Sequence, residues 1–178
     1  MNRAVILYGA PATGKDTVTA ALVQLDTRFQ LFERMKAGPG RTTGYRMTTT
    51  DTLDALCHAG EIVWLNERYN ARYAIDRPEL RALIKAGRIP VVHAGQPEVI
   101  PAVTRAMTDV RWTVIELRCS RETAYERIIA RETGDTLARL AAWDSTPKLT
   151  SASAVIDTDS ITPIEAAQII HAIACPIG

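Results

Sequence analysis

The chain has 178 residues and a formal net charge of +1, with 47% hydrophobic and 23% charged residues. This length suits one domain with a substantial core, which we predict to span residues 1–178. The near-neutral charge excludes a global electrostatic pull toward nucleic acid or a membrane surface, and no apolar run approaches the ~20 residues that a membrane helix needs. The three cysteines show no metal-ligand spacing, and their odd number argues against a disulfide framework, so we expect a cytoplasmic protein with reduced thiols.

The first third of the chain opens with the apolar run "AVILY" (4–8), which predicts a strand buried on both faces rather than a signal peptide. A helix over 15–25 follows, because its apolar residues recur at helical spacing. Residues 29–33 indicate a second strand. The Gly-, Thr- and Arg-rich segment that follows, up to residue 50, predicts an exposed excursion. A helix over 51–60 and an extended segment with a turn over 61–75 complete this part.

The rest of the chain alternates between strands and well-delimited helices. Asp76, Ser120 and Thr162 are candidate helix N-caps, and Thr162 has Pro163 and Glu165 where a capping box requires them. The predicted strands are residues 88–95, 111–119 and 153–157, and the predicted helices are residues 76–87, 97–107, 120–134, 135–143 and 161–173.

This alternation predicts an α/β fold with a parallel sheet covered by helices on both faces. Two segments depart from it, at about 34–75 and 131–142. We interpret them as excursions from the main sheet.

The stretch "GAPATGKDT" directly follows the first strand and precedes the first helix, which is the context of a phosphate-binding P-loop. Glycines let backbone amides turn toward an anion, and the following helix directs its positive end at the same point. A plain glycine turn joining strand to helix is the alternative. We predict that ATP is bound by Gly9, Ala10, Pro11, Ala12, Thr13, Gly14, Lys15, Asp16 and Thr17.

Asp16 stands where a P-loop usually carries a hydroxyl that holds Mg²⁺. A carboxylate is a stronger hard-oxygen ligand for that ion, but it repels phosphates when the ion is absent. Thr17 keeps a hydroxyl one position further on. We therefore predict a metal site at Asp16 and Thr17 and a strong dependence on Mg²⁺.

With this loop in place, the chain resembles the guanylate kinase family of P-loop kinases. It is closest in motif to the ribose 1,5-bisphosphate phosphokinases, which share "GKD". The resemblance implies the three-layer P-loop NTPase fold, with the first excursion binding a phosphorylated acceptor and the second forming a lid. It implies an acceptor site at Arg34, Lys36, Arg41, Tyr45 and Tyr73. Val63 and Ile75 stand at the family's guanine-reading positions, which argues against guanosine monophosphate.

The lid resemblance assigns a catalytic, phosphate-gripping role to Arg131 and Arg139 beside Lys15, with Arg127 as a candidate third arginine. The stretch "VIDTDSITPIEAA" resembles the family's adenine-bordering loop. The implied activity is ATP-dependent phosphoryl transfer to a nucleoside monophosphate or sugar phosphate. Two alternatives stay open. One is a hydroxyl kinase using Glu33 as base, and the other is a non-catalytic binding module. The sequence leaves the oligomeric state open.

Overall fold

A computed structural model describes residues 1–68, 70–132 and 134–176 of the chain. The predicted single domain and both predicted excursions therefore include positions that lie outside the described residues. Residue 69 belongs to the predicted turn within 61–75, and residue 133 belongs to the predicted lid.

The main sheet contains β1 (Asn2–Tyr8) at its centre. The other strands are β2 (Phe29–Leu31), β7 (Ile89–Ala94), β8 (Val110–Arg118) and β9 (Ala154–Asp157). They lie in the order β2-β7-β1-β8-β9, and every neighbouring pair is parallel. The predicted parallel sheet is confirmed.

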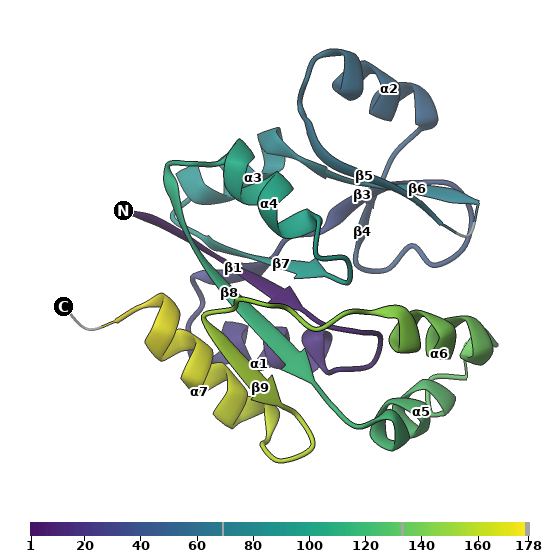
Figure 1. Ribbon diagram of the computed structural model, residues 1–178. Coiled ribbons are helices and arrows are strands. Elements are labelled where there is room, and N and C mark those ends of the chain that lie inside the picture. The colour runs from purple at the N-terminus through teal and green to yellow at the C-terminus, as the bar shows by residue number, and fades with distance from the viewer. Residues whose placement is uncertain (69, 133, 177–178) are drawn as a thin grey trace.

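Helices cover both faces of this sheet, giving three layers (Figure 1). On one face, α1 (Lys15–Leu25) and α7 (Pro163–Ala174) pack over Val5 and Leu7. On the other face, α3 (Arg77–Lys85) and α4 (Val99–Ala106) pack over Ala4, Ile6 and Tyr8. Successive strand side chains point to opposite faces, so β1 contributes to both cores, and its residues from Ala4 to Tyr8 are apolar.

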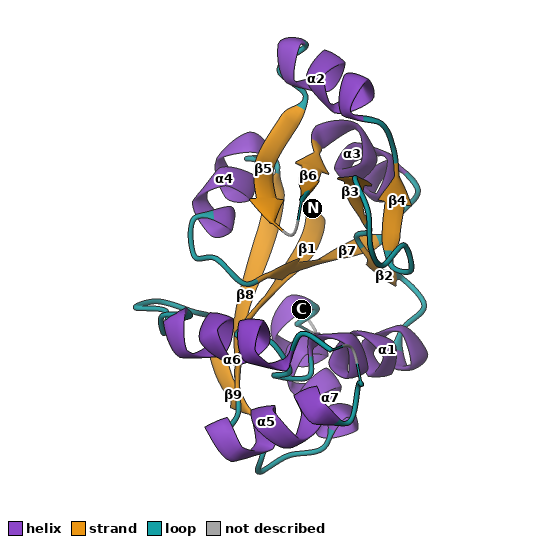
Figure 2. Ribbon diagram, turned by 90° about the vertical axis from the view of Figure 1, so that its right-hand side faces the viewer, coloured by secondary structure: helices purple, strands orange, loops and turns teal. Residues whose placement is uncertain are grey.

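A second sheet rises from the edge of the first (Figures 1 and 2). Its strand order is β4 (Tyr45–Met47), β3 (Arg34–Ala37), β6 (Ala71–Asp76) and β5 (Ile62–Arg68), with α2 (Thr50–His58) beside it. The prediction of an exposed segment after residue 33 is wrong for β3. Strands pair with it on both sides, and Met35 and Ala37 pack against Leu53 of α2.

Two helices, α5 (Arg121–Ile129) and α6 (Thr136–Ser145), follow β8 beyond its carboxyl end. The helix predicted to end near residue 134 ends at Ile129, five residues earlier. Leu140 of α6 and Ile128 of α5 pack with Ala12, so this pair of helices is attached to the loop after β1.

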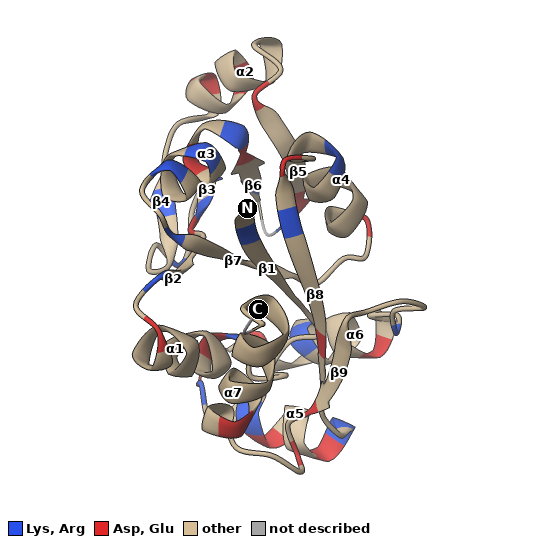
Figure 3. Cartoon of the chain, turned by 90° about the vertical axis from the view of Figure 1, so that its left-hand side faces the viewer, with Lys and Arg blue, Asp and Glu red and all other residues tan. Residues whose placement is uncertain are grey.

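The predicted N-caps are confirmed. Asp76 and Ser120 accept hydrogen bonds from the backbone amides of Glu79 and Thr123. Thr162 and Glu165 form the reciprocal capping box. Acidic and basic positions are interspersed along the elements (Figure 3). Within the described part of the chain, we find no helix whose length and apolar character would let it cross a membrane.

Candidate nucleotide and acceptor site

The loop between β1 and α1 has the backbone of an anion cradle. Ala12 and Gly14 have φ of 63° and 92°, in the left-handed region, which turns successive amides inward. A Cβ on Gly9 would lie 2.5 Å from the carbonyl oxygen of Leu117, so only glycine fits there. No side chain caps the N-terminus of α1, which leaves its first amides for a ligand.

Lys15 begins α1 and folds back over the loop. Its Nζ donates hydrogen bonds to the carbonyl oxygens of Gly9 at 2.7 Å and Ala10 at 2.8 Å. Burial lowers the pKa of Lys15 to about 8, and the positive charges of Arg34 and Arg131 act in the same direction. The site therefore concentrates positive charge around an ammonium group that burial has already destabilised.

Asp16 projects from the same turn with 60% of its side chain exposed. Its Oδ1 lies 3.5 Å from Nδ1 of His93, whose Nε2 is 2.7 Å from Oγ1 of Thr19. Burial lowers the pKa of His93 to about 4, and the neighbouring Lys15 contributes to this shift, so the imidazole is neutral at physiological pH. His93 is thus built into the site as a neutral hydrogen-bonding group.

A cavity of about 690 Å³ opens at the carboxyl ends of the main-sheet strands. This is the edge at which parallel α/β sheets bind ligands. Among the described residues, its charged lining consists of Lys15, Arg34, Arg41, Arg68, Arg131 and Arg139, with Asp16 and Glu98 as the acidic members. Basic groups from the phosphate loop, the second sheet and the α5–α6 region therefore face one space.

The second sheet contributes Arg34, Arg41 and Tyr45 to this cavity, as the sequence predicts for an acceptor site. Arg34 donates to the carbonyl oxygen of His93 through Nη2, and burial lowers the pKa of its guanidinium. Lys36 and Tyr73, predicted to bind the acceptor with them, do not line the cavity.

Lys36 instead has a buried role, with only 1% of the residue exposed. Its Nζ donates to the carbonyl oxygen of Arg41 at 2.7 Å. It also lies 5.5 Å from the ring centroids of both Tyr45 and Tyr73, whose rings are 5.4 Å apart. Lys36 therefore supports the Arg41 loop by its hydrogen bond, and Lys36 and Tyr73 both pack against the Tyr45 ring.

The α5–α6 region places Arg131 and Arg139 at the cavity, and Nε of Arg139 donates to Asp135 at 2.7 Å. Arg127, the candidate third arginine, points elsewhere. It donates to the carbonyl oxygens of Ala12 at 3.1 Å and Thr158 at 3.0 Å. Through these hydrogen bonds, Arg127 links α5 to the loop after β1 and to the loop after β9.

A second cavity of about 350 Å³ lies on the other side of the phosphate loop. Its lining includes Arg127 and Arg131 and the segment Ile161–Pro163. Thr17, predicted as a metal ligand, lines this second cavity and donates to the carbonyl oxygen of Gly14 at 2.9 Å. The structure thus places Asp16, and not Thr17, at the larger cavity.

Val63 and Ile75 have a different role from the one assigned by resemblance. Ile75 is fully buried and Val63 is partly buried, and both belong to the core beneath α3 and α4. Neither lines the larger cavity. Their apolar character is explained by packing, so it carries no argument about guanine.

Several polar residues of the cavity were not predicted, among them Arg68, Gln96 and Glu98. Gln96 and Glu98 follow β7, which is the neighbour of β1. Their place at the cavity could have been inferred from the predicted strand 88–95, because the carboxyl ends of parallel strands meet at one edge of the sheet. Arg68 ends β5, and its approach to the cavity depends on the second sheet, which no local pattern indicates.

These residues fit the ligands that the motif implies. The inward-turned loop, the uncapped helix and Lys15 suit the phosphates of ATP, and the carboxylate of Asp16 suits Mg²⁺. The ion, when bound, would neutralise phosphate charge beside Asp16.

Comparison with known proteins gives the fold its class. No protein-family model matches the chain, and no curated protein matches it by sequence. Among solved structures, a guanylate kinase from Anaplasma phagocytophilum is 15% identical, with a TM-score of 0.58 over 98% of this chain and 87% of its own. The protein APE1195 is 16% identical, with a TM-score of 0.61 over 99% of this chain and 97% of its own. A sugar kinase from Janibacter sp. is 16% identical, with a TM-score of 0.57 over the same shares.

At these identities the similarity defines the fold, which is the P-loop NTPase type of α/β architecture. The loop after β1 has the sequence pattern of a P-loop, and both cavities described above adjoin it.

Proposed function

We propose that the protein is an ATP-dependent kinase that transfers a phosphoryl group to a small phosphorylated acceptor. The observation that carries this proposal is the single cavity in which Lys15 faces arginines from two other parts of the fold. A nucleoside monophosphate or a sugar phosphate such as ribose 1,5-bisphosphate has the size and charge to enter it.

Different parts of the fold would have different tasks in phosphoryl transfer. Phosphoryl transfer requires mainly positioning and charge neutralisation. The loop over 9–15 and Lys15 would hold the phosphates of ATP, while Arg34, Arg41 and Tyr45 would hold the acceptor. Arg131 and Arg139 would neutralise the group in transfer, because a planar guanidinium fork pairs well with phosphate oxygens.

The second cavity gives the base of ATP a place to bind. It adjoins the phosphate loop at Ala12 and Gly14 and is bordered by the start of α7. This agrees with the resemblance of the segment before α7 to an adenine-bordering loop. Nucleotide and acceptor would then approach the loop from opposite sides.

A second candidate function is phosphorylation of a plain hydroxyl group, which requires a base. Glu98 lines the cavity and favours this candidate, as does the similarity to a sugar kinase. Glu33, the base suggested by the sequence, is exposed outside the cavity, where its carbonyl oxygen accepts from Arg46. A purely binding module, the remaining alternative, has no need for three basic side chains around a phosphate loop.

Steady-state kinetics with Mg-ATP tests the proposal. The acceptors are guanosine monophosphate, other nucleoside monophosphates, ribose 1,5-bisphosphate and small alcohols. We expect turnover with at least one phosphorylated acceptor and none with the alcohols. Turnover of alcohols alone would favour the second candidate, with Glu98→Gln as its next test. No magnesium-dependent turnover of ATP with any acceptor would favour a binding module.

Lys15→Ala tests the phosphate loop itself. Loss of its charge beside the transferring group should lower kcat/KM by on the order of 100-fold or more while the circular dichroism spectrum stays unchanged. Lys85→Ala is the matched control, because Lys85 is an exposed lysine at the end of α3. Equal activity in the two variants would contradict the assignment.

A further inference from the structure

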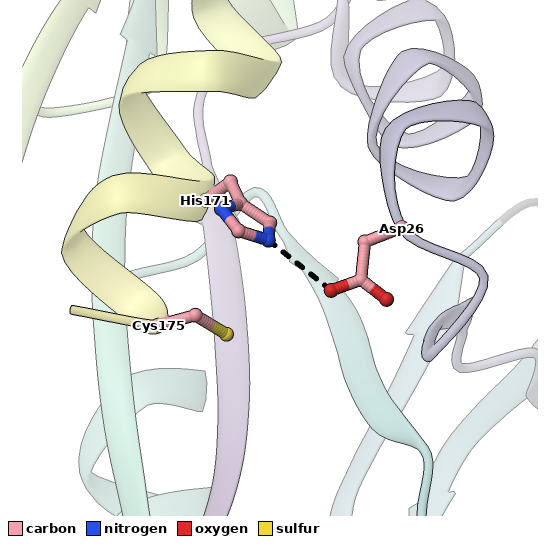
Figure 4. Close-up of side chains that lie close together, drawn as sticks. All are labelled: Asp26, His171 and Cys175. Atoms are coloured by element: carbon pink, nitrogen blue, oxygen red, sulfur yellow. Dashed lines mark hydrogen bonds and ion pairs between the residues drawn. The ribbon is translucent and has the colours of Figure 1, made fainter. Parts of the chain in front are cut away.

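Three side chains with different donor atoms converge at the end of the molecule away from the phosphate loop. Asp26 is the C-cap of α1, while His171 and Cys175 lie one turn apart at the end of α7. A carboxylate oxygen, an imidazole nitrogen and a thiol sulfur all lie within 4.8 Å of one another. Figure 4 shows the imidazole and the sulfur directed toward the side of Asp26.

We propose that Asp26, His171 and Cys175 form a binding site for a zinc ion that ties α1 to α7. One sulfur, one nitrogen and one oxygen ligand match the borderline-soft character of Zn²⁺, and three protein ligands leave one position for water. The spacing between the cysteines alone predicts no metal site. The i, i+4 pair of His171 and Cys175 becomes a candidate only when Asp26 is brought beside it.

Zinc binding would require the three ligand atoms to move slightly closer together. Nε2 of His171 is already 3.1 Å from Oδ2 of Asp26. Zinc–sulfur and zinc–nitrogen bonds of roughly 2.3 and 2.0 Å place two tetrahedral ligand atoms about 3.5 Å apart. A rotation of the Cys175 side chain supplies most of the change. The ion would bind Nε2 of His171, and the imidazole would keep one proton, on Nδ1. Any further imidazole proton and the proton of the thiol would pass to solvent.

The surroundings would partly shield the proposed ion from solvent. Cys175 is 8% exposed, and the side chains of Asp26 and His171 are 14% and 33% exposed. The ring of Phe29 packs 5.9 Å from the imidazole. Thiolate and carboxylate together balance the two charges of the ion. Arg28 binds both oxygens of Asp26 through Nε and Nη2, and its Nη2 also lies 4.0 Å from Sγ of Cys175. Its guanidinium would turn away from the sulfur when the ion binds and act as an outer partner that orients the carboxylate.

The site is independent of the proposed catalysis. Asp26 follows the last residue of α1, while Lys15 begins it, so the helix separates the two sites by about 16 Å. Metal binding can therefore be measured without an activity assay.

Cobalt and zinc titrations of chelator-treated full-length protein test the proposal. Co²⁺ should bind with a near-ultraviolet thiolate-to-cobalt charge-transfer band that Cys175→Ser abolishes. Cys57→Ser should keep it, because Cys57 is an exposed cysteine on α2. In competition titrations, Cys175→Ser and His171→Ala should each weaken zinc binding by about 10- to 100-fold or more.

Zinc should also raise the melting temperature of the wild type and of Cys57→Ser but not of Cys175→Ser. The absence of a thiolate band in the wild type would overturn the proposal without any variant. Equal zinc affinity in Cys175→Ser would overturn it as well. In either case the three residues would be only a hydrogen-bonded contact between α1 and α7.

Discussion

Lys15 combines two properties at the scale of a single residue. Its ammonium group lies over the loop proposed to hold the phosphates of ATP, and burial together with the nearby arginines brings its pKa down to about 8. In the unliganded protein, the charged form of Lys15 therefore predominates below pH 8 and is lost as the pH rises through that value. Bound phosphate would favour the charged form.

The pH dependence of kcat/KM for ATP should reflect this shift, because that ratio reports the ionisation of the free enzyme. We expect it to be constant from about pH 6 to 7.5 and to fall roughly tenfold per unit above pH 8. His93, with a pKa of about 4, should contribute no step between pH 5 and 8. A rate that stays level to pH 10 would show that Lys15 is not the titrating group.

Asp16 is the second residue whose role can be isolated. Asp16→Ala should raise the magnesium concentration needed for half-maximal rate, because the ion loses a carboxylate ligand. Asp16→Ser should retain part of the activity through the hydroxyl that is usual at this position. Magnesium titrations measure both. Superimposable curves for the wild type and Asp16→Ala would leave Asp16 only as a favourable charge at the N-terminus of α1.

At the scale of elements, β3 carries Arg34 and the loop between β3 and β4 carries Arg41, the two arginines proposed to hold the acceptor, and the buried Lys36 hydrogen-bonds to this loop. Lys36→Met keeps the length of the side chain but removes the hydrogen bond to Arg41 and the attraction to the tyrosine rings. We expect KM for the acceptor to rise roughly tenfold, equivalent to about 1.4 kcal/mol, with little change in KM for ATP. Lys148→Met is the control, because Lys148 is an exposed lysine outside the cavity. An equal rise in both KM values would argue against a role in the acceptor site alone.

At the scale of the whole molecule, the cavity is assembled from parts that belong to different layers. The loop after β1 belongs to the main sheet, Arg34 and Arg41 belong to the second sheet and its β3–β4 loop, and Arg131 and Arg139 belong to the α5–α6 region. Ligands for the loop and for the second sheet should therefore bind separately and stabilise the fold in combination.

Thermal unfolding tests this division. A non-hydrolysable Mg-ATP analogue and a phosphorylated acceptor should each stabilise the protein, by about 2.7 kcal/mol at a hundred times the dissociation constant. Lys15→Ala should lose the shift from the nucleotide and keep the shift from the acceptor, whereas Arg34→Met should show the reverse. Loss of both shifts in either variant would indicate one undivided site.

The sequence by itself determined the features that rest on local chemistry. The apolar run of β1, the glycines around Lys15 and the capping residues Asp76, Ser120 and Thr162 each act within a few neighbouring residues. Backbone conformation and hydrogen bonding near a helix end depend on those neighbours alone. Strand–helix alternation then defines a parallel sheet, because connections between parallel strands must cross over.

Only the tertiary structure decided which side chains share a space. Lys36 and Arg41 lie in one basic segment, yet pairing on both sides of β3 buries Lys36, whereas the loop after β3 exposes Arg41. Arg68 and Glu98 reach the same cavity from elements far apart in the sequence, and Asp26 meets Cys175 in the same way. Such contacts follow from how sheets and helices pack, and packing depends on all residues that bury apolar surface together.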